Sequence, residues 1–223
     1  MLIYAALVGI ILGVVQASFF EWTFHRYWLH RPWQPKGVFT AHTLVHHQLC
    51  KYEDTFHVEH EEQYEALHFQ WWGGFLLMVL NVTPWFLAGR FLVPQLPWVP
   101  FVIGLAGAFF VYYLLYEFMH YLMHKPQVGW LERSRVFTFI KRHHQIHHVH
   151  MDKNLNVLLP LADWLLGSLV LETEMPKVTP PGALALARRH SKRARKEQSA
   201  QATGRTEVDS LDTTDGADSR EPV

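Results

Sequence analysis

The 223-residue sequence holds a single cysteine, Cys50, which excludes an intrachain disulfide framework and any cysteine-rich zinc or iron–sulfur site. It also lacks net charge, because 20 basic side chains balance 20 acidic ones. A chain without an overall positive field is not expected to bind nucleic acid. Its length suits one ordinary domain rather than two.

Charge is absent from the first twenty residues, and twenty helical residues reach roughly the 30 Å thickness of a bilayer's hydrocarbon core. The basic start and the cleavage site of a signal peptide are missing, so we expect a retained membrane anchor at about residues 1–20. Two further apolar stretches, at about 71–93 and 98–119, flank a short proline-rich connection and predict a hairpin of membrane helices. The shorter apolar stretch 155–171 is expected to pack as a buried or interfacial segment, and the choice between three and four spans stays open.

Positive charges predict the orientation of these spans. If Met1 is outside, Arg90 is the only Lys or Arg on the outer side, as the positive-inside rule favours. We therefore expect an integral protein of a bacterial inner membrane or the endoplasmic reticulum. Residues 1–187 would form the membrane domain, and residues 188–223, first basic and then acidic, would form a disordered tail.

Histidine is abundant instead, and most of the sixteen histidines fall into four short groups near the ends of the expected spans or in the cytoplasmic part. On a helix, residues three or four apart share one face. Only the first pair, five residues apart, would diverge unless its helix ends or bends before Pro32. The four groups are His25 and His30; His42, His46 and His47; His120 and His124; and His144, His147 and His148.

Ten imidazoles exceed the four to six ligand positions of one metal ion, so the pattern predicts two metals. The zinc-protease motif His-Glu-x-x-His is absent, because Tyr64 stands where the second histidine should follow His60. A pair of redox-active irons beside a membrane fits a harder reaction, the attack of activated oxygen on an unactivated alkyl C–H bond.

Several other residues have alternative interpretations. His143 is able to replace His144, because it also pairs with His147 at a spacing of four. Glu117 and Asp163 are candidates either for orienting a ligand imidazole or for structural pairing. The remaining histidines are expected to be solvated, interfacial or unrelated to the site; they are His57, His60, His68, His150 and His190.

These motifs, in this order, resemble the fatty acid hydroxylase/sterol desaturase superfamily of integral membrane diiron enzymes. The likeness covers about residues 20–172 and includes the segment 154–168 that follows the last histidine group. The resemblance implies an all-α fold, in which a membrane helical bundle carries a cytoplasmic helical cap (21–70 and 120–172) that holds a dimetal site. It also implies that the ten grouped histidines are the metal ligands, with no further catalytic residue.

The resemblance implies oxygen-dependent hydroxylation or desaturation of a lipid such as a fatty acyl chain or a sterol. Two iron ions would serve as cofactors, although zinc is able to take their place, and O2 would be the co-substrate. No cytochrome b5-like domain is present, so electrons would come from a separate protein such as cytochrome b5 or a ferredoxin. Two rivals are a carotenoid-ring hydroxylase and a histidine-rich metal transporter. The transporter is disfavoured because the apolar stretches lack ligands at mid-membrane.

Overall fold

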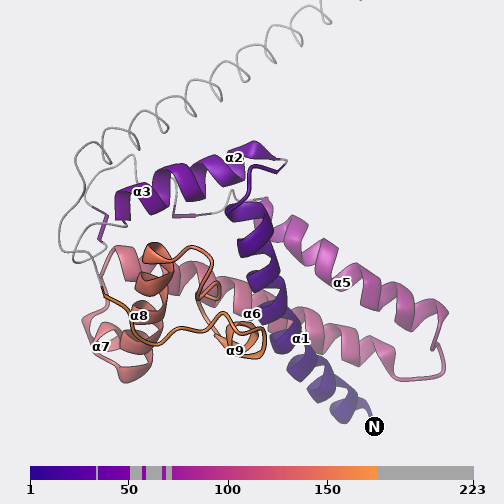
Figure 1. Ribbon diagram of the computed structural model, residues 1–223. Coiled ribbons are helices and arrows are strands. Elements are labelled where there is room, and N and C mark those ends of the chain that lie inside the picture. Colours follow the sequence, from indigo (N-terminus) through magenta and orange to yellow (C-terminus); the bar gives the residue numbers. More distant parts are fainter. Residues whose placement is uncertain (34, 51–56, 59–66, 69–71, 175–223) are drawn as a thin grey trace, which may run out of the picture.

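The structure is a computed structural model that describes residues 1–33, 35–50, 57–58, 67–68 and 72–174 (Figure 1). All regular secondary structure within these ranges is helical, which confirms the predicted all-α class. Two of the segments, labelled η, are π-helical turns. The elements are α1 (Leu2–Phe24), η1 (His25–Leu29), α2 (Lys36–Phe39), η2 (Thr40–His46), α3 (His47–Cys50), α5 (Gly73–Phe91), α6 (Trp98–His124), α7 (Gly129–Glu132), α8 (Arg135–Val149) and α9 (Leu161–Leu165).

Three of the described helices are long and apolar enough to cross a membrane: Leu2–Leu29, Gly73–Phe91 and Trp98–His124. They coincide with the three predicted spans and extend two of them. α1 continues through η1, and α6 continues beyond residue 119 to His124. Two of the histidine groups are therefore carried on the same rigid helices that would cross the bilayer.

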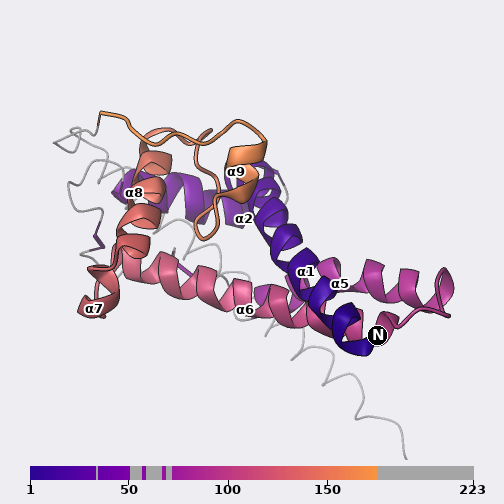
Figure 2. The ribbon, with the colours of Figure 1, turned by 90° about the horizontal axis from the view of Figure 1, so that it is seen from below.

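Glycines let α1 and α6 approach until their backbones touch. A Cβ atom at Gly9 would lie 2.0 Å from the Phe101 carbonyl oxygen, and one at Gly104 would lie 2.3 Å from the Ala6 carbonyl oxygen. Small residues at such contacts are the usual means by which membrane helices pack closely. Figure 2 shows α1 crossing α6, with the N-terminus at the end of the molecule where α5 turns into α6.

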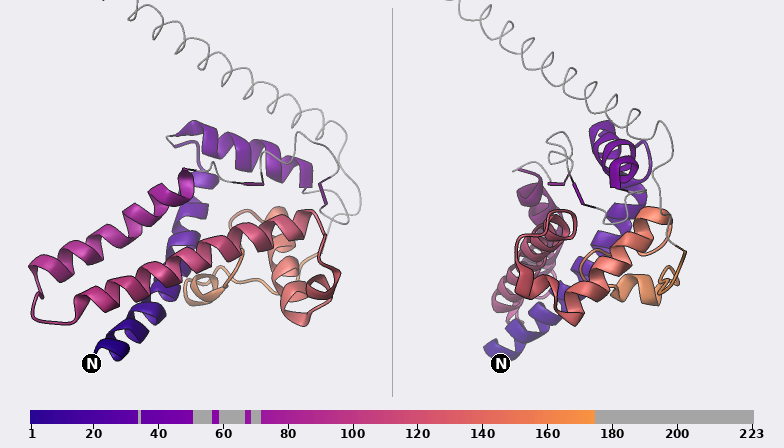
Figure 3. Two further views of the ribbon diagram at one scale, coloured as in Figure 1. Left: turned by 180° about the vertical axis from the view of Figure 1, so that it is seen from behind. Right: turned by 90° about the vertical axis from the view of Figure 1, so that its left-hand side faces the viewer.

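The other histidine-bearing elements gather at the opposite end of the bundle. The continuous helical segment 36–50 passes over the end of α1, and α8 follows the end of α6 after a short connection (Figures 1 and 3). Ser134 caps α8, because its hydroxyl accepts a hydrogen bond from the Phe137 amide at 3.1 Å.

The apolar stretch after α8 packs against α1, as a buried or interfacial segment would. The Ser18 hydroxyl donates to the Leu159 carbonyl at 2.9 Å and accepts from the Ala162 amide at 3.2 Å. Leu155, Val157 and Ala162 are buried. The predicted tail at 188–223 lies outside the described residues, as do His60 and His190.

Candidate metal centre

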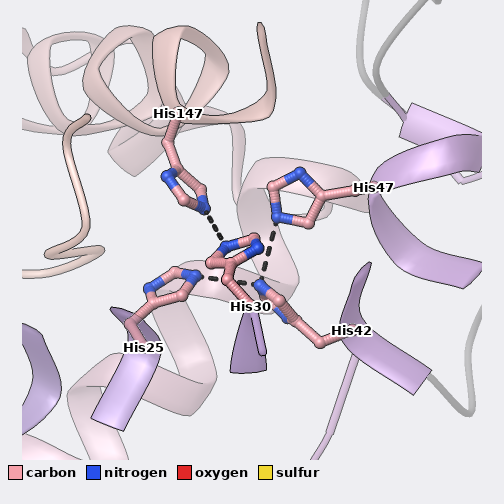
Figure 4. A group of neighbouring side chains, drawn as sticks. All are labelled: His25, His30, His42, His47 and His147. Carbon is pink, nitrogen blue, oxygen red and sulfur yellow. Dashed lines mark hydrogen bonds between the residues drawn. The ribbon is translucent and has the colours of Figure 1, made fainter. Parts of the chain in front are cut away.

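Nine of the ten predicted ligands form two groups in which the donor nitrogens all lie within 4.8 Å of one another. Every member of both groups except the partly exposed His30 is buried. Figure 4 shows the rings of the first group pointing toward a common centre. The first histidine group consists of His25, His30, His42, His47 and His147; the second consists of His46, His124, His144 and His148.

His120, the tenth predicted ligand, lies beside the second group. Its ring centroid is 5.0 Å from those of His46 and His124 and 4.9 Å from that of His144. Its Nε2 is buried and has no hydrogen-bond partner among the described residues. His120 is therefore placed to make the second group, like the first, a set of five rings.

Two π turns bring together histidines that are five residues apart. The His30 amide donates to the His25 carbonyl at 3.2 Å, and the His47 amide donates to the His42 carbonyl in the same i to i+5 pattern. A π turn is wider than an α turn, so residues at this spacing share a face. The rings of His25 and His30 consequently stack with centroids 5.0 Å apart. The expected helix end before Pro32 is present, since η1 ends at Leu29, and the π turn itself supplies the convergence.

Hydrogen bonds fix which nitrogen of several rings faces the centre of the first group. Nδ1 of His25 donates to the Leu155 carbonyl at 2.6 Å, and Nδ1 of His147 donates to the Lys153 carbonyl at 2.8 Å. Nδ1 of His30 lies 3.0 Å from the Thr43 hydroxyl, whose own proton is donated to the Leu29 carbonyl. These partners are acceptors, so a neutral ring at each position carries its proton on Nδ1 and leaves Nε2 with a free lone pair.

The free nitrogens then face each other. Nε2 of His30 lies 3.0 Å from Nε2 of His147, as the dashed line in Figure 4 shows. Burial lowers the pKa of His30 to about 2 and that of His147 to about 4, so neither ring holds a second proton near neutral pH. Two lone pairs at this distance repel each other unless a cation lies between them. The donor set therefore fits a metal ion.

The spacing of the donor nitrogens also fits a metal. Nε2 of His42 lies 2.8 Å from that of His25 and 3.1 Å from that of His47. In the second group, Nε2 of His144 lies 3.0 Å from those of both His124 and His148. Two nitrogens bound to one ion at about 2.1 Å and at right angles are separated by about 3.0 Å. Each group could thus hold one ion.

Adjacent histidines separate into different groups. His46 belongs to the second group and His47 to the first, whereas His147 belongs to the first and His148 to the second. The rings of His47 and His148 stack across the boundary with centroids 4.3 Å apart. The pairs His46–His47 and His147–His148 thus each contribute one ring to each group.

Asp163 holds the loop that orients the first group. Its carboxylate accepts hydrogen bonds from the Leu155 amide at 2.9 Å and the Asn156 amide at 2.7 Å. Burial alone would raise the pKa of Asp163, but hydrogen bonds from His143, Ser168 and these amides outweigh it and keep the pKa below its ordinary value. The carboxylate therefore fixes the loop that carries the Lys153 and Leu155 carbonyls.

The structure distinguishes between two adjacent candidates in α8. His144 joins the second histidine group, whereas His143 turns away and places Nε2 3.1 Å from the Asp163 carboxylate. Asp163 thus holds a ring nitrogen, as one interpretation of the sequence expected, but that ring lies outside both histidine groups.

Glu117 makes a structural pair and does not orient a ligand imidazole. Its carboxylate lies 3.2 Å from Nδ1 of His68, whereas Nδ1 of His120 faces the Leu67 carbonyl at 3.2 Å. His57 contacts Lys141 at 2.9 Å, and His150 contacts the Thr173 hydroxyl at 2.8 Å. None of these three further histidines belongs to either group of donor nitrogens.

Sequence reasoning missed the groups that orient the rings. Thr43 follows His42 directly, but its bonds reach back to Leu29 and His30, fourteen and thirteen residues earlier. The carbonyl that orients His25 belongs to Leu155, 130 residues away. Every residue has a backbone carbonyl, so a sequence does not show which carbonyl orients a ring. The one signal was the segment 154–168, which resembles the superfamily and contains Leu155.

Comparison with known proteins identifies a family. The family described as "Fatty acid hydroxylase" matches residues 10–168, a range that includes all ten predicted ligands. The searches of curated proteins and of solved structures return no match.

Proposed function

Because the chain belongs to the fatty acid hydroxylase family, we propose that it hydroxylates an alkyl C–H bond of a membrane lipid at a pair of iron ions. One ion would be held by the first histidine group. The other would be held by the second histidine group together with His120. No side chain beyond these ten histidines is assigned a catalytic role.

The approach of His30 and His147 is the observation that carries this proposal. Their Nε2 atoms face each other at 3.0 Å, and both Nδ1 protons are already donated elsewhere. Imidazole suits iron, zinc and copper, so the ligand set alone does not select the metal. The family supplies that choice, and zinc in a purified sample would be compatible with the same ligands.

Bound iron would supply the redox chemistry that activates O2. The balanced reaction inserts one oxygen atom into the C–H bond and reduces the other to water, using two protons and two electrons. The electrons come from a separate reductant, for which a cytochrome b5 or a ferredoxin is the proposed class. The chain's own part is to hold the ligand rings in place and to exclude water, since His47, His147 and His148 are fully buried.

Lipid analysis with isotopic oxygen tests the proposal. Membranes containing the iron-loaded protein, a reductant and 18O2 are expected to yield lipids that gain one 18O atom, and the His147→Ala variant is expected to yield none. Loss of two hydrogens without a gain of oxygen would show desaturation instead. Oxidised carotenoids without oxidised acyl chains would indicate the ring hydroxylase. Absence of every oxygen-dependent lipid product would overturn the proposal.

We also propose that the histidine groups face the cytoplasm, on the strength of the positive charges. Arg90 lies at the end of α5 that is remote from the histidine groups. A green fluorescent protein fused to the C-terminus should fluoresce, whereas a fused periplasmic phosphatase should be inactive in a bacterial host. The reverse pair of results would contradict this orientation.

A further inference from the structure

An apolar groove runs between α1, α5 and α6 and ends beside the first histidine group. Along the continuous helix formed by α1 and η1, its lining extends from Ala17 to Leu29, a rise of about 18 Å. His25 lines the groove and places Nε2 2.8 Å from that of His42. The groove therefore connects the interior of the helical bundle with the candidate metal centre. Its other walls include Phe20, Phe24, Leu77, Phe109 and Tyr116.

The groove is open on one side because the three helices are packed unequally. α6 packs closely on both α1 and α5, whereas α1 and α5 make little backbone contact with each other. Gly74 of α5 lies against the Tyr113 ring of α6, where a Cβ atom would meet the ring at 2.6 Å. The side of the groove away from α6 thus lies between α1 and α5, the two helices that are least packed on each other.

A polar bridge between α1 and α5 closes the inner end of the groove. The Gln16 amide donates to the backbone carbonyl of Asn81 at 3.1 Å and to its side-chain oxygen at 3.0 Å. The Trp85 indole donates to the Gln16 side-chain oxygen at 2.7 Å. The bridge lies next to Ala17 and one helical turn beyond Leu77, which are the deepest residues of the lining on their helices.

The bridge also reaches the third helix and divides the apolar space in two. The Trp85 ring contacts the Phe101 ring of α6, with centroids 5.4 Å apart. On its far side lies a separate apolar pocket, lined among others by Tyr4, Val8 and Trp98. The bonds between Gln16 and Asn81 are partly buried, and Trp85 joins them from the partly exposed edge of the bundle. Such groups stay paired with one another because lipid offers them no alternative partners.

We infer that this groove binds a single alkyl chain of a membrane lipid, which enters between α1 and α5 and reaches no farther than the Gln16–Asn81–Trp85 bridge. The inference rests on the proposed function for the identity of the occupant as substrate. The groove itself argues for an alkyl chain, since its lining is almost wholly apolar and includes His25 at one end. The bridge then limits the length of chain that fits.

Photocrosslinking with a fatty acid that carries a diazirine near its methyl end tests the inference on the intact protein. Labelled peptides are expected from α1 around Ala17 and from α5 around Leu77 and Asn81. Excess unmodified fatty acid should suppress this labelling. Labels confined to the lipid-facing side of α5, at Phe75 and Leu80, would overturn the inference, and this readout needs neither catalysis nor a variant.

A matched pair of variants on α5 provides a second test. Leu77→Trp fills the groove and should reduce labelling of the groove peptides at least tenfold. Leu80→Trp adds the same side chain on the exposed face, where the native residue is 57% exposed, and should leave labelling unchanged. Equal labelling of the two variants would refute the groove as the binding site. Groove labelling in a protein that forms no oxidised lipid would support the inference and count against the proposed function alone.

Discussion

His46 and His47 are neighbours in the chain, but their rings stand at 89° to one another and enter different histidine groups. His147 and His148 divide in the same way. Each of these two pairs therefore gives one ring to each group, and the two short helical segments that carry them contribute to both groups. This arrangement keeps the two groups in contact, as the stacking of His47 on His148 shows.

The division of neighbours predicts that two double variants with equal numbers of lost rings behave differently. His46→Ala/His148→Ala removes two rings of the second group and leaves the first group complete. One ion should remain with its original affinity, and the other should be lost. His46→Ala/His47→Ala removes one ring from each group, so both ions should be weakened, by at least the 10–100-fold that loss of an orienting partner costs.

Titration with a competing chelator and measurement of the metal released separates the two cases. The same-group variant should lose one ion at low chelator concentration and retain the other up to the concentration that strips the wild-type protein. The cross-group variant should lose both ions at low chelator concentration. His150→Ala is the control, because that ring is exposed and contacts Thr173. Identical release curves for the two double variants would contradict the grouping.

Thr43 is predicted to position His30. Thr43→Val keeps the shape of the side chain but leaves Nδ1 of His30 without its acceptor and the Leu29 carbonyl without its donor. Affinity for one ion should fall 10–100-fold. Thr43→Ser retains the hydroxyl and should restore the affinity in the same chelator competition. Equal affinities of the valine and serine variants would show that this hydroxyl does not hold the ring.

Asp163 is predicted to stabilise the loop at residues 153–157. In Asp163→Asn, an amide nitrogen replaces one of the two oxygens that accept the Leu155 and Asn156 amides. A buried donor that loses its acceptor costs about 1–3 kcal/mol, so thermal unfolding in detergent should occur at lower temperature. Asp152→Asn, at an exposed position, is the control and should leave the midpoint in place. An unchanged midpoint for Asp163→Asn would be inconsistent with this role.

The contact of α1 with α6 is predicted to depend on Gly104. In Gly104→Ala, the new Cβ atom would lie 2.3 Å from the Ala6 carbonyl oxygen, so the helices must move apart. Overpacking of this kind costs about 1–3 kcal/mol. Gly107→Ala adds the same methyl group to the same helix where no atom lies within 4 Å, and it should be neutral. Comparable unfolding midpoints for the two variants would argue against close helix packing at Gly104.

The helical spans and the four histidine motifs along the sequence could be predicted, because each depends on a local sequence pattern. An apolar run of about twenty residues specifies a span by its length, and a spacing of three or four specifies a helical face. The apolar run was expected to end near residue 119, and α6 continues as one helix to His124, so that His120 and His124 share the face predicted from their spacing.

The division of rings between the two groups was not readable, because it depends on tertiary contacts. Spacing alone gave no preference between His143 and His144, and the choice comes from Asp163 in a segment twenty residues later. The π turns at His25 and His42 likewise replace the regular helical period on which the spacing argument relied. Local periodicity thus identified the ligand candidates but not their partners.

The central claim is that ten imidazoles, nine of them buried, hold a pair of metal ions. Elemental analysis of the purified, iron-loaded chain, with protein quantified by amino-acid analysis, tests it most directly. The arrangement of the two groups predicts two metal ions per chain after removal of loosely bound metal. A ratio of one, or a protein that retains no metal, would contradict the account.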